Sequence, residues 1–194
     1  MQRPENMSEI KVLTECAVLA ALSFALSAIP TPMQMPLGGT VSWFSTVPVL
    51  IAALRHGFIW GTGTAMVHGM VQLLMGFDNV TYAYAAGFAA AVGCALLDYV
   101  LAYTALGVAG LIFARSKRGV DGCVSAVLIS GALRLLCSFL SGVLIWSSYT
   151  PEGWNVTAYS LAYNAAWCVP DVAIALAGVL ALQKVIPYRA RHAE

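Results

Sequence analysis

The sequence predicts an all-α integral membrane protein with six transmembrane helices and both termini in the cytoplasm. Of its 194 residues, 60% are hydrophobic and only 10% are charged, whereas soluble domains contain about a quarter charged residues. A hydrocarbon core about 30 Å thick requires about 20 apolar residues per helix. The chain can therefore hold six spans and little else, and we expect residues 1–194 to form one transmembrane domain without a separate soluble domain.

The first three spans are predicted in the N-terminal half. The first, residues 12–29, ends at Pro30-Thr31-Pro32, because proline cannot continue a helix. The second, residues 40–54, is short and contains Pro48, which predicts an irregular start or a kink. The third covers residues 58–75 and is expected to break at the turn-rich run of residues 76–79.

The last three spans are longer. Residues 80–114 contain no strong helix breaker and exceed one perpendicular crossing, so we expect a long tilted helix or an interruption near Gly107 and Gly110. The fifth span covers residues 120–146 and the sixth residues 154–185, where Pro170 predicts a kink.

The basic residues predict the orientation, because cytoplasmic loops collect Lys and Arg. The basic residues between and after the spans follow the even-numbered spans, which places both termini in the cytoplasm. These residues are Arg55, Arg115, Lys117, Arg118, Lys184, Arg189 and Arg191.

Composition and motifs exclude several function classes. The net charge of +1 and the lack of a basic stripe argue against nucleic acid as a partner. No metal-binding or disulfide spacing joins the five scattered cysteines, which we interpret as small packing residues: Cys16, Cys94, Cys123, Cys137 and Cys168. The chain lacks the nucleotide-binding motif GxxxxGK[ST], the zinc motif HExxH and the nucleophile motif GxSxG. It is therefore not expected to hydrolyse ATP or to act as an enzyme with a resident cofactor or metal.

Charged side chains inside the predicted spans mark candidate functional positions, since each costs about 2.5–3.5 kcal/mol to insert. Four such residues are present: Glu15, Asp98, Arg134 and Asp171. Asp98 and Arg134 could simply pair to hold the fourth and fifth spans together, and they could also bind a ligand. The sequence assigns no role to Glu15 or Asp171.

Polar and aromatic groups gather toward the outer half of the last two spans. Arg134 and Ser138 lie one helical turn apart and share a face. Trp146, Tyr159 and Asn164 add flat rings and an amide, a mixture suited to a small ring-containing ligand. A membrane-interface aromatic belt is the alternative interpretation for Trp146 and for Trp154.

Two features of the first and third spans are open to more than one interpretation. Ala17, Ala21 and Ala25 form a stripe of small residues, which either packs within this protein or docks onto another membrane subunit. His68 is interpreted as a helix-packing histidine rather than a metal ligand.

Several sequence blocks resemble one known family. They are LTECAVLAAL at 13–22, VPVLIAALRHG at 47–57, LDY at 97–99 with LGVAG at 106–110, and WSSY at 146–149 with AYSLAYN at 158–164. In this order and over nearly the whole chain, they resemble the thiamine-specific substrate-binding subunits (S-components) of bacterial energy-coupling factor (ECF) transporters.

The resemblance implies a multi-pass protein of the bacterial plasma membrane that binds thiamine with high affinity near the outer face for ATP-driven uptake. It implies assembly with a transmembrane coupling subunit and two cytoplasmic ATPase subunits, and it identifies the stripe Ala17, Ala21 and Ala25 with the family's docking motif for partner subunits. The family's ligand-facing positions fall on Asp98, Tyr99, Trp146, Tyr159 and Asn164, and the 33–39 loop is expected to close over the ligand.

Some positions depart from the family pattern. Arg134 and Ser138 stand where some members have Lys and His facing the ligand, and Asp98 replaces a Glu. A loop Trp of some members falls near Gly39, with Trp43 as a candidate substitute.

The residues suit thiamine, a permanent cation with an aminopyrimidine ring, because Asp98 offers an anion and the aromatic residues offer ring faces. Three alternatives remain open. They are an S-component for another vitamin or a thiamine precursor, a stand-alone channel or secondary carrier, and a small membrane enzyme using Asp98, His68 and Ser138.

Overall fold

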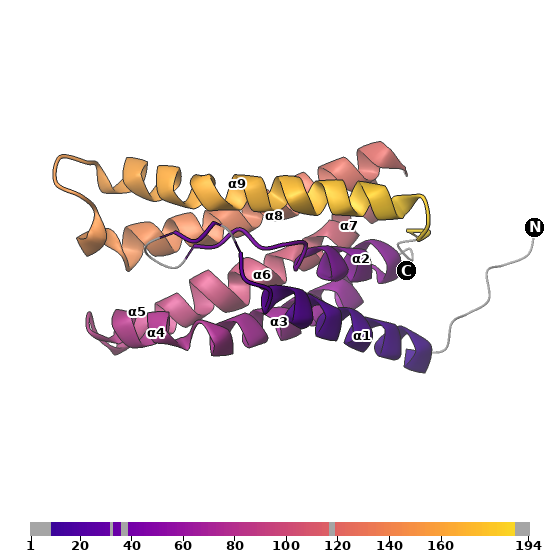
Figure 1. Cartoon of the computed structure of the whole chain (residues 1–194), viewed down its shortest axis with the longest axis horizontal. Coiled ribbons are helices and arrows are strands. Elements are labelled where there is room, and N and C mark those ends of the chain that lie inside the picture. The colour runs from indigo at the N-terminus through magenta and orange to yellow at the C-terminus, as the bar shows by residue number, and fades with distance from the viewer. Residues whose placement is uncertain (1–8, 32, 36–38, 117–118, 189–194) are drawn as a thin grey trace, which may run out of the picture.

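The structure, a computed structural model, is a bundle of helices (Figure 1). It describes residues 9–31, 33–35, 39–116 and 119–188. Within those ranges there is no β-strand, and the one extended pairing is an isolated antiparallel bridge between Gln34 and Thr40. Four helical stretches are long and apolar enough to cross a membrane: Glu9–Ser27, Phe88–Arg115, Val120–Leu144 and Val156–Gln183.

The elements follow one another with short connections. The N-terminal half contains α1 (Glu9–Ser27), α2 (Val47–His56), α3 (Phe58–Met75) and α4 (Phe77–Tyr84). One continuous helical stretch then combines α5 (Phe88–Cys94), the π-helix η1 (Ala95–Leu101), α6 (Ala102–Thr104), the 3₁₀ turn η2 (Ala105–Gly107) and α7 (Val108–Arg115). The C-terminal half contains α8 (Val120–Leu144), the 3₁₀ turn η3 (Ser147–Tyr149) and α9 (Val156–Gln183).

Two boundaries differ from the sequence prediction. The run 76–79 interrupts the helical structure only at Gly76, because α4 begins at Phe77. The real interruption lies at Gly87, whose φ of +118° is open to glycine and strained for other residues. The prediction that no helix break occurs at the start of the 80–114 segment is therefore wrong. The interruption predicted near Gly107 is present as the 3₁₀ turn η2.

The second predicted span is only partly helical. Residues 40–46 are irregular and α2 starts at Val47, with Pro48 in its first turn, where a missing N–H costs nothing. All ten residues of α2 except Arg55 are buried. A helix of this length can sit at membrane depth because the surrounding helices, rather than lipid, cover it.

Close helix contacts around α2 depend on glycine. A Cβ added at Gly61 of α3 would lie 2.5 Å from the Cα of Ala53, and one at Gly110 of α7 would lie 2.6 Å from the Ala53 carbonyl oxygen. Leu50 and Leu54 are fully buried in the same core. Backbone approach of this kind stabilises helix bundles in lipid, where burial of apolar area gives little driving force.

A buried polar network joins α1 to α3 and confirms His68 as a packing residue. Ser23 Oγ donates to the Ser45 carbonyl oxygen, so it must accept the 2.9 Å hydrogen bond from His68 Nδ1. His68 Nε2 is then the acceptor for Gln72 Nε2 at 3.3 Å, and the same amide donates to Ser27 Oγ at 2.6 Å. Both imidazole nitrogens are thus used, Nδ1 by Ser23 of α1 and Nε2 by Gln72 of the same helix α3.

The outward face of α1 carries the small-residue stripe. Ala17, Ala21 and Ala25 are all exposed, so the alternative interpretation, in which the stripe packs within this protein, does not hold among the described residues. Glu15 does have a partner, because its carboxylate contacts Arg55 Nε at 2.5 Å and His56 Nε2 at 3.2 Å, which ties α1 to the end of α2.

The start of α1 and the end of α9 lie at the same end of the bundle, and α4, α5 and η3 lie at the other (Figure 1). Of the basic residues used to predict orientation, Lys117, Arg118, Arg189 and Arg191 lie outside the described residues. Cytoplasmic termini remain a prediction.

Candidate functional site

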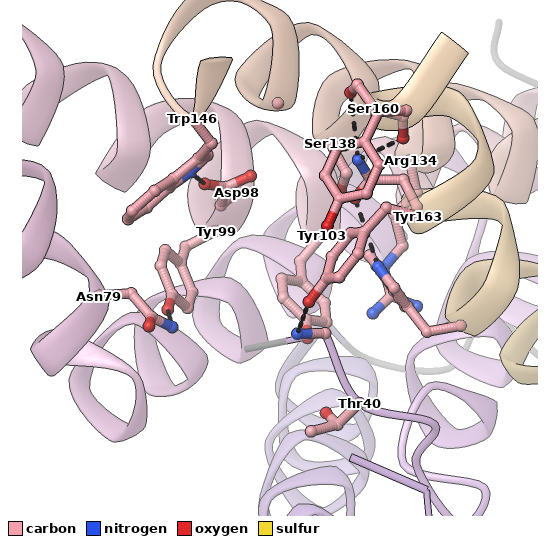
Figure 2. A pocket seen from close by; sticks show the side chains of 15 residues that line it. Thr40, Asn79, Asp98, Tyr99, Tyr103, Arg134, Ser138, Trp146, Ser160 and Tyr163 are labelled. Atoms are coloured by element: carbon pink, nitrogen blue, oxygen red, sulfur yellow. Dashed lines mark hydrogen bonds between the residues drawn. The ribbon is translucent and has the colours of Figure 1, made fainter. Parts of the chain in front are cut away.

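A pocket opens among the helices and is lined by side chains from both halves of the chain. All seven residues that the sequence predicted for ligand binding line it: Asp98, Tyr99, Arg134, Ser138, Trp146, Tyr159 and Asn164. Figure 2 shows the pocket with one group around Asp98 and Trp146 and a second group around Arg134, Tyr103 and Tyr163.

The first group is held around the Asp98 carboxylate. Its Oδ2 atom accepts hydrogen bonds from Ser141 Oγ at 2.7 Å and from Trp146 Nε1 at 3.1 Å. Asp98 belongs to the π-helix η1, a helix irregularity that is frequent at functional sites. The two donors fix the carboxylate and the indole ring relative to each other, which gives an anion beside an aromatic face.

Tyr99, the neighbour of Asp98, is anchored on α4. Its hydroxyl donates to the Gly76 carbonyl oxygen and accepts from Asn79 Nδ2, both at 2.9 Å. These bonds join the long helical stretch to the start of α4 and position the ring along the pocket wall.

The second group is built around Arg134, and it corrects one expectation. Arg134 does not pair with Asp98: its Nη1 donates to Asp171 Oδ2 at 2.5 Å. The guanidinium also lies over the rings of Tyr103, at 4.5 Å from the centroid, and Trp167, at 5.0 Å. Arg134 is therefore held by an ion pair and two ring contacts, and the ion pair joins α8 to α9.

The α9 wall has its own hydrogen-bond ladder. Asn164 Nδ2 donates to the Ser160 carbonyl oxygen at 2.9 Å, and Asn164 Oδ1 accepts from Trp167 Nε1 at 3.3 Å. Gly142 of α8 permits this close approach, since a Cβ there would lie 3.2 Å from Asn164 Nδ2 and closer still to Ser160. The amide is thus held in one orientation toward the pocket.

Several lining residues were not predicted from sequence: Thr40, Asn79, Tyr103, Gly142, Ser160, Tyr163 and Trp167. Helical spacing could have indicated two of them, because Ser160 and Trp167 lie four and three residues from Asn164 on one helix face. The candidate Trp43 does not line the pocket. Trp167 comes instead from α9, and its indole packs so closely on Gly39 that no side chain fits there.

The pocket has the chemistry of a binding site. Asp98 and Arg134 are the charged residues among the described lining, set within aromatic rings and short hydroxyl and amide groups. No group of three potential metal ligands is close together among the described residues. Trp154, by contrast, lies outside the lining and is 56% exposed.

Comparisons with known proteins show the family of this chain. A family model described as "Thiamine transporter protein" matches residues 13–190. The chain belongs to this thiamine transporter family. It is 33% identical over 179 residues to the thiamine transporter ThiT of Bacillus subtilis, covering 87% of this chain and 85% of that protein.

Further relatives extend the comparison. ThiT of Lacticaseibacillus paracasei is 24% identical over 195 residues, covering 94% of this chain and 92% of that protein. A solved structure of ThiT from Listeria monocytogenes superposes with a TM-score of 0.74, covering 93% of this chain and 97% of that one at 24% identity, which shows a shared fold. This member of the thiamine transporter family is thus a multi-pass protein of the bacterial plasma membrane and not an enzyme.

Proposed function

We propose that this protein is the high-affinity thiamine-binding subunit of an ATP-driven ECF-type uptake transporter. The observation that carries the proposal is the Asp98 carboxylate, held beside the Trp146 indole in an aromatic pocket. A permanent cation with a flat ring is attracted by both groups, because the carboxylate neutralises it and the ring face attracts it.

The rest of the pocket suits the neutral aminopyrimidine ring. Tyr159, Ser138 and Asn164 offer hydroxyl and amide groups along one side. Such groups orient a heteroaromatic ring through hydrogen bonds, and aromatic neighbours supply stacking area. Gly39 also lines the pocket, and its N–H donates to the Tyr163 hydroxyl at 3.5 Å. The 33–39 segment, of which residues 36–38 lie outside the described residues, is proposed to close over bound thiamine.

Energy for uptake is proposed to come from partner subunits. The chain has no nucleotide-binding motif, and the exposed stripe Ala17, Ala21 and Ala25 offers a surface for close helix contact. In this proposal a transmembrane coupling subunit docks on α1 and two cytoplasmic ATPase subunits drive release of thiamine to the cytoplasm. Six crossings with both termini inside are proposed for the chain, in agreement with α1 starting and α9 ending at one end of the bundle.

Thiamine binding is tested by titrating the purified, detergent-solubilised chain and following quenching of Trp fluorescence. We expect tight, saturable quenching. Its midpoint should shift to higher thiamine concentration in Trp146→Phe, where Trp167 still reports the ligand, and stay unchanged in the matched variant Trp154→Phe, whose indole is exposed outside the pocket. A competition series with flavins and thiamine precursors identifies the ligand. An equal quenching midpoint in both variants, or a preferred ligand other than thiamine, would contradict the proposal.

Coupling is tested by uptake in cells with and without the ECF ATPase subunits. Ala21→Trp is expected to leave thiamine binding unchanged and to abolish uptake, because a bulky side chain separates the docking helices. Ala162→Trp, an equally exposed alanine on α9, is the control and should transport normally. Uptake that persists without any ATPase would instead indicate a stand-alone carrier.

A further inference from the structure

We propose that Ser141 is a positioning residue whose buried hydroxyl sets how strongly the pocket prefers a cationic ring to a neutral ring. Ser141 acts through Asp98 and Trp146 and does not itself contact the ligand. The inference rests on the proposed function and deepens it, because it assigns recognition of the ligand's charge to a residue outside the pocket lining.

Ser141 lies behind the pocket wall and holds two lining residues at once. It is 0% exposed and does not line the pocket, whereas Asp98 and Trp146 both do. Its Oγ donates to Asp98 Oδ2 at 2.7 Å, and its carbonyl oxygen accepts from the backbone N–H of Trp146 at 3.3 Å. The indole Nε1 of Trp146 then donates to the same Asp98 Oδ2 at 3.1 Å. The three bonds form a closed triangle that fixes the anion and the aromatic ring together.

The direction of its hydroxyl distinguishes Ser141 from other serines of α8. A serine hydroxyl in a helix commonly donates to a carbonyl oxygen of the preceding turn. Ser125 and Ser130 do this, bonding to carbonyl oxygens four and three residues earlier at 2.6 and 3.1 Å. The Ser141 hydroxyl instead crosses to Asp98 of η1. A hydroxyl has only one hydrogen to donate, so Ser141 gives its hydrogen to the site rather than to its own helix.

The triangle controls the distance between the carboxylate and a bound cation. Attraction between two charges weakens as they separate, and it is stronger in a partly buried site than in water. Without the Ser141 hydroxyl, Oδ2 of Asp98 keeps only the bond from Trp146, and the carboxylate gains freedom to turn. Fixing it again when a ligand binds costs conformational entropy. A neutral ring draws little on the carboxylate, so its affinity depends less on this orientation.

The experiment measures dissociation constants for the purified, detergent-solubilised chain by isothermal titration calorimetry. The two ligands are thiamine and an analogue in which an uncharged thiophene ring replaces the cationic thiazolium. In the unmodified protein we expect the neutral analogue to bind at least about tenfold more weakly than thiamine, because it lacks the charge pair with Asp98. Ser141→Ala should weaken thiamine by about tenfold, as loss of a hydrogen bond to a charged group predicts, and the analogue by less than about threefold.

Two control variants separate the hydrogen bond from packing. Ser130→Ala removes an equally buried hydroxyl of α8 whose hydrogen bond stays within that helix, and it should leave both affinities unchanged. Ser141→Cys keeps a side chain of similar size but offers only a weak donor, so thiamine binding should stay weakened. Full recovery of thiamine affinity in Ser141→Cys would assign the effect to packing and overturn the inference.

A double variant gives the sharpest test. Asp98→Asn removes the charge that Ser141 positions, so adding Ser141→Ala to it should not change the ratio of the two affinities any further. If Asp98→Asn does not fold, the single variants decide the matter with the two ligands.

Several results would overturn the inference and leave the proposed function standing. They are equal affinity of the unmodified protein for the two ligands, equal weakening of both ligands by Ser141→Ala, tighter thiamine binding in that variant, and a further change of the ratio in the double variant. No binding of thiamine to the unmodified protein would overturn the proposed function and this inference with it.

Discussion

The buried ion pair between α8 and α9 makes a quantitative prediction about stability. Arg134 and Asp171 are 4% and 2% exposed, and their charged atoms lie 2.5 Å apart. Removing one partner leaves an uncompensated buried charge, which costs about 3–5 kcal/mol. Arg134→Met and Asp171→Asn should each destabilise the protein by about that amount.

The double variant carries the sharper expectation. Without either charge there is no unpaired ion to desolvate, and neutral replacements of buried ion pairs are often nearly as stable as the pair itself. Arg134→Met with Asp171→Asn should therefore be at least about 2 kcal/mol more stable than the sum of the single effects predicts, a coupling typical of residues in direct contact.

The melting temperatures of these variants can be measured through the native cysteines. Cys16, Cys94, Cys123 and Cys168 are buried and unpaired, so a maleimide dye that fluoresces on reaction with thiols reports unfolding during a temperature ramp. At roughly 2–4 °C per kcal/mol for a chain of this size, the single variants should melt roughly 10 °C below the parent. Strictly additive effects in the double variant, or a parent-like melting temperature in either single variant, would refute the reasoning.

Three other substitutions test separate parts of the fold. Gly61→Ala places a Cβ against the α2 backbone and should cost about 1–3 kcal/mol, whereas Gly63→Ala, with nothing within 4 Å, should be nearly neutral in the same thermal assay. His68→Leu removes one hydrogen bond between α1 and α3 and one within α3, and should destabilise the protein by about 1–3 kcal/mol. Burial raises the pKa of the Tyr188 hydroxyl above its ordinary value of about 10, so stability should be lost as pH rises above about 10, less steeply in Tyr188→Phe.

Sequence reasoning located much of the candidate site because helical spacing is local. Arg134 and Ser138 are four residues apart on α8, so their common face follows from 3.6 residues per turn alone. Tyr159 and Asn164 were indicated instead by the sequence blocks that resemble the family. The scarcity of charge inside apolar segments similarly indicated Asp98 and Arg134 as candidate binding residues.

Partnerships between helices did not follow from the same information. The opposite charges of Asp98 and Arg134 allowed an ion pair between them. In the structure Asp98 instead accepts hydrogen bonds from Ser141 and Trp146, and Arg134 pairs with Asp171. Which oppositely charged groups come into contact depends on the rotation and depth of each helix in the bundle. The periodicity of a single helix gives no information about either of these.

The sequence by itself determined the class of protein, the approximate position of its apolar segments and seven side chains that line one pocket. Only the tertiary structure decided that α2 is a ten-residue buried helix, that Gly87 interrupts the long apolar segment and that Trp167 supplies an aromatic wall. The physical reason is that propensity and hydrophobicity act over one or two turns, whereas close backbone contacts, ion pairs and pocket walls arise from packing between segments distant in the chain.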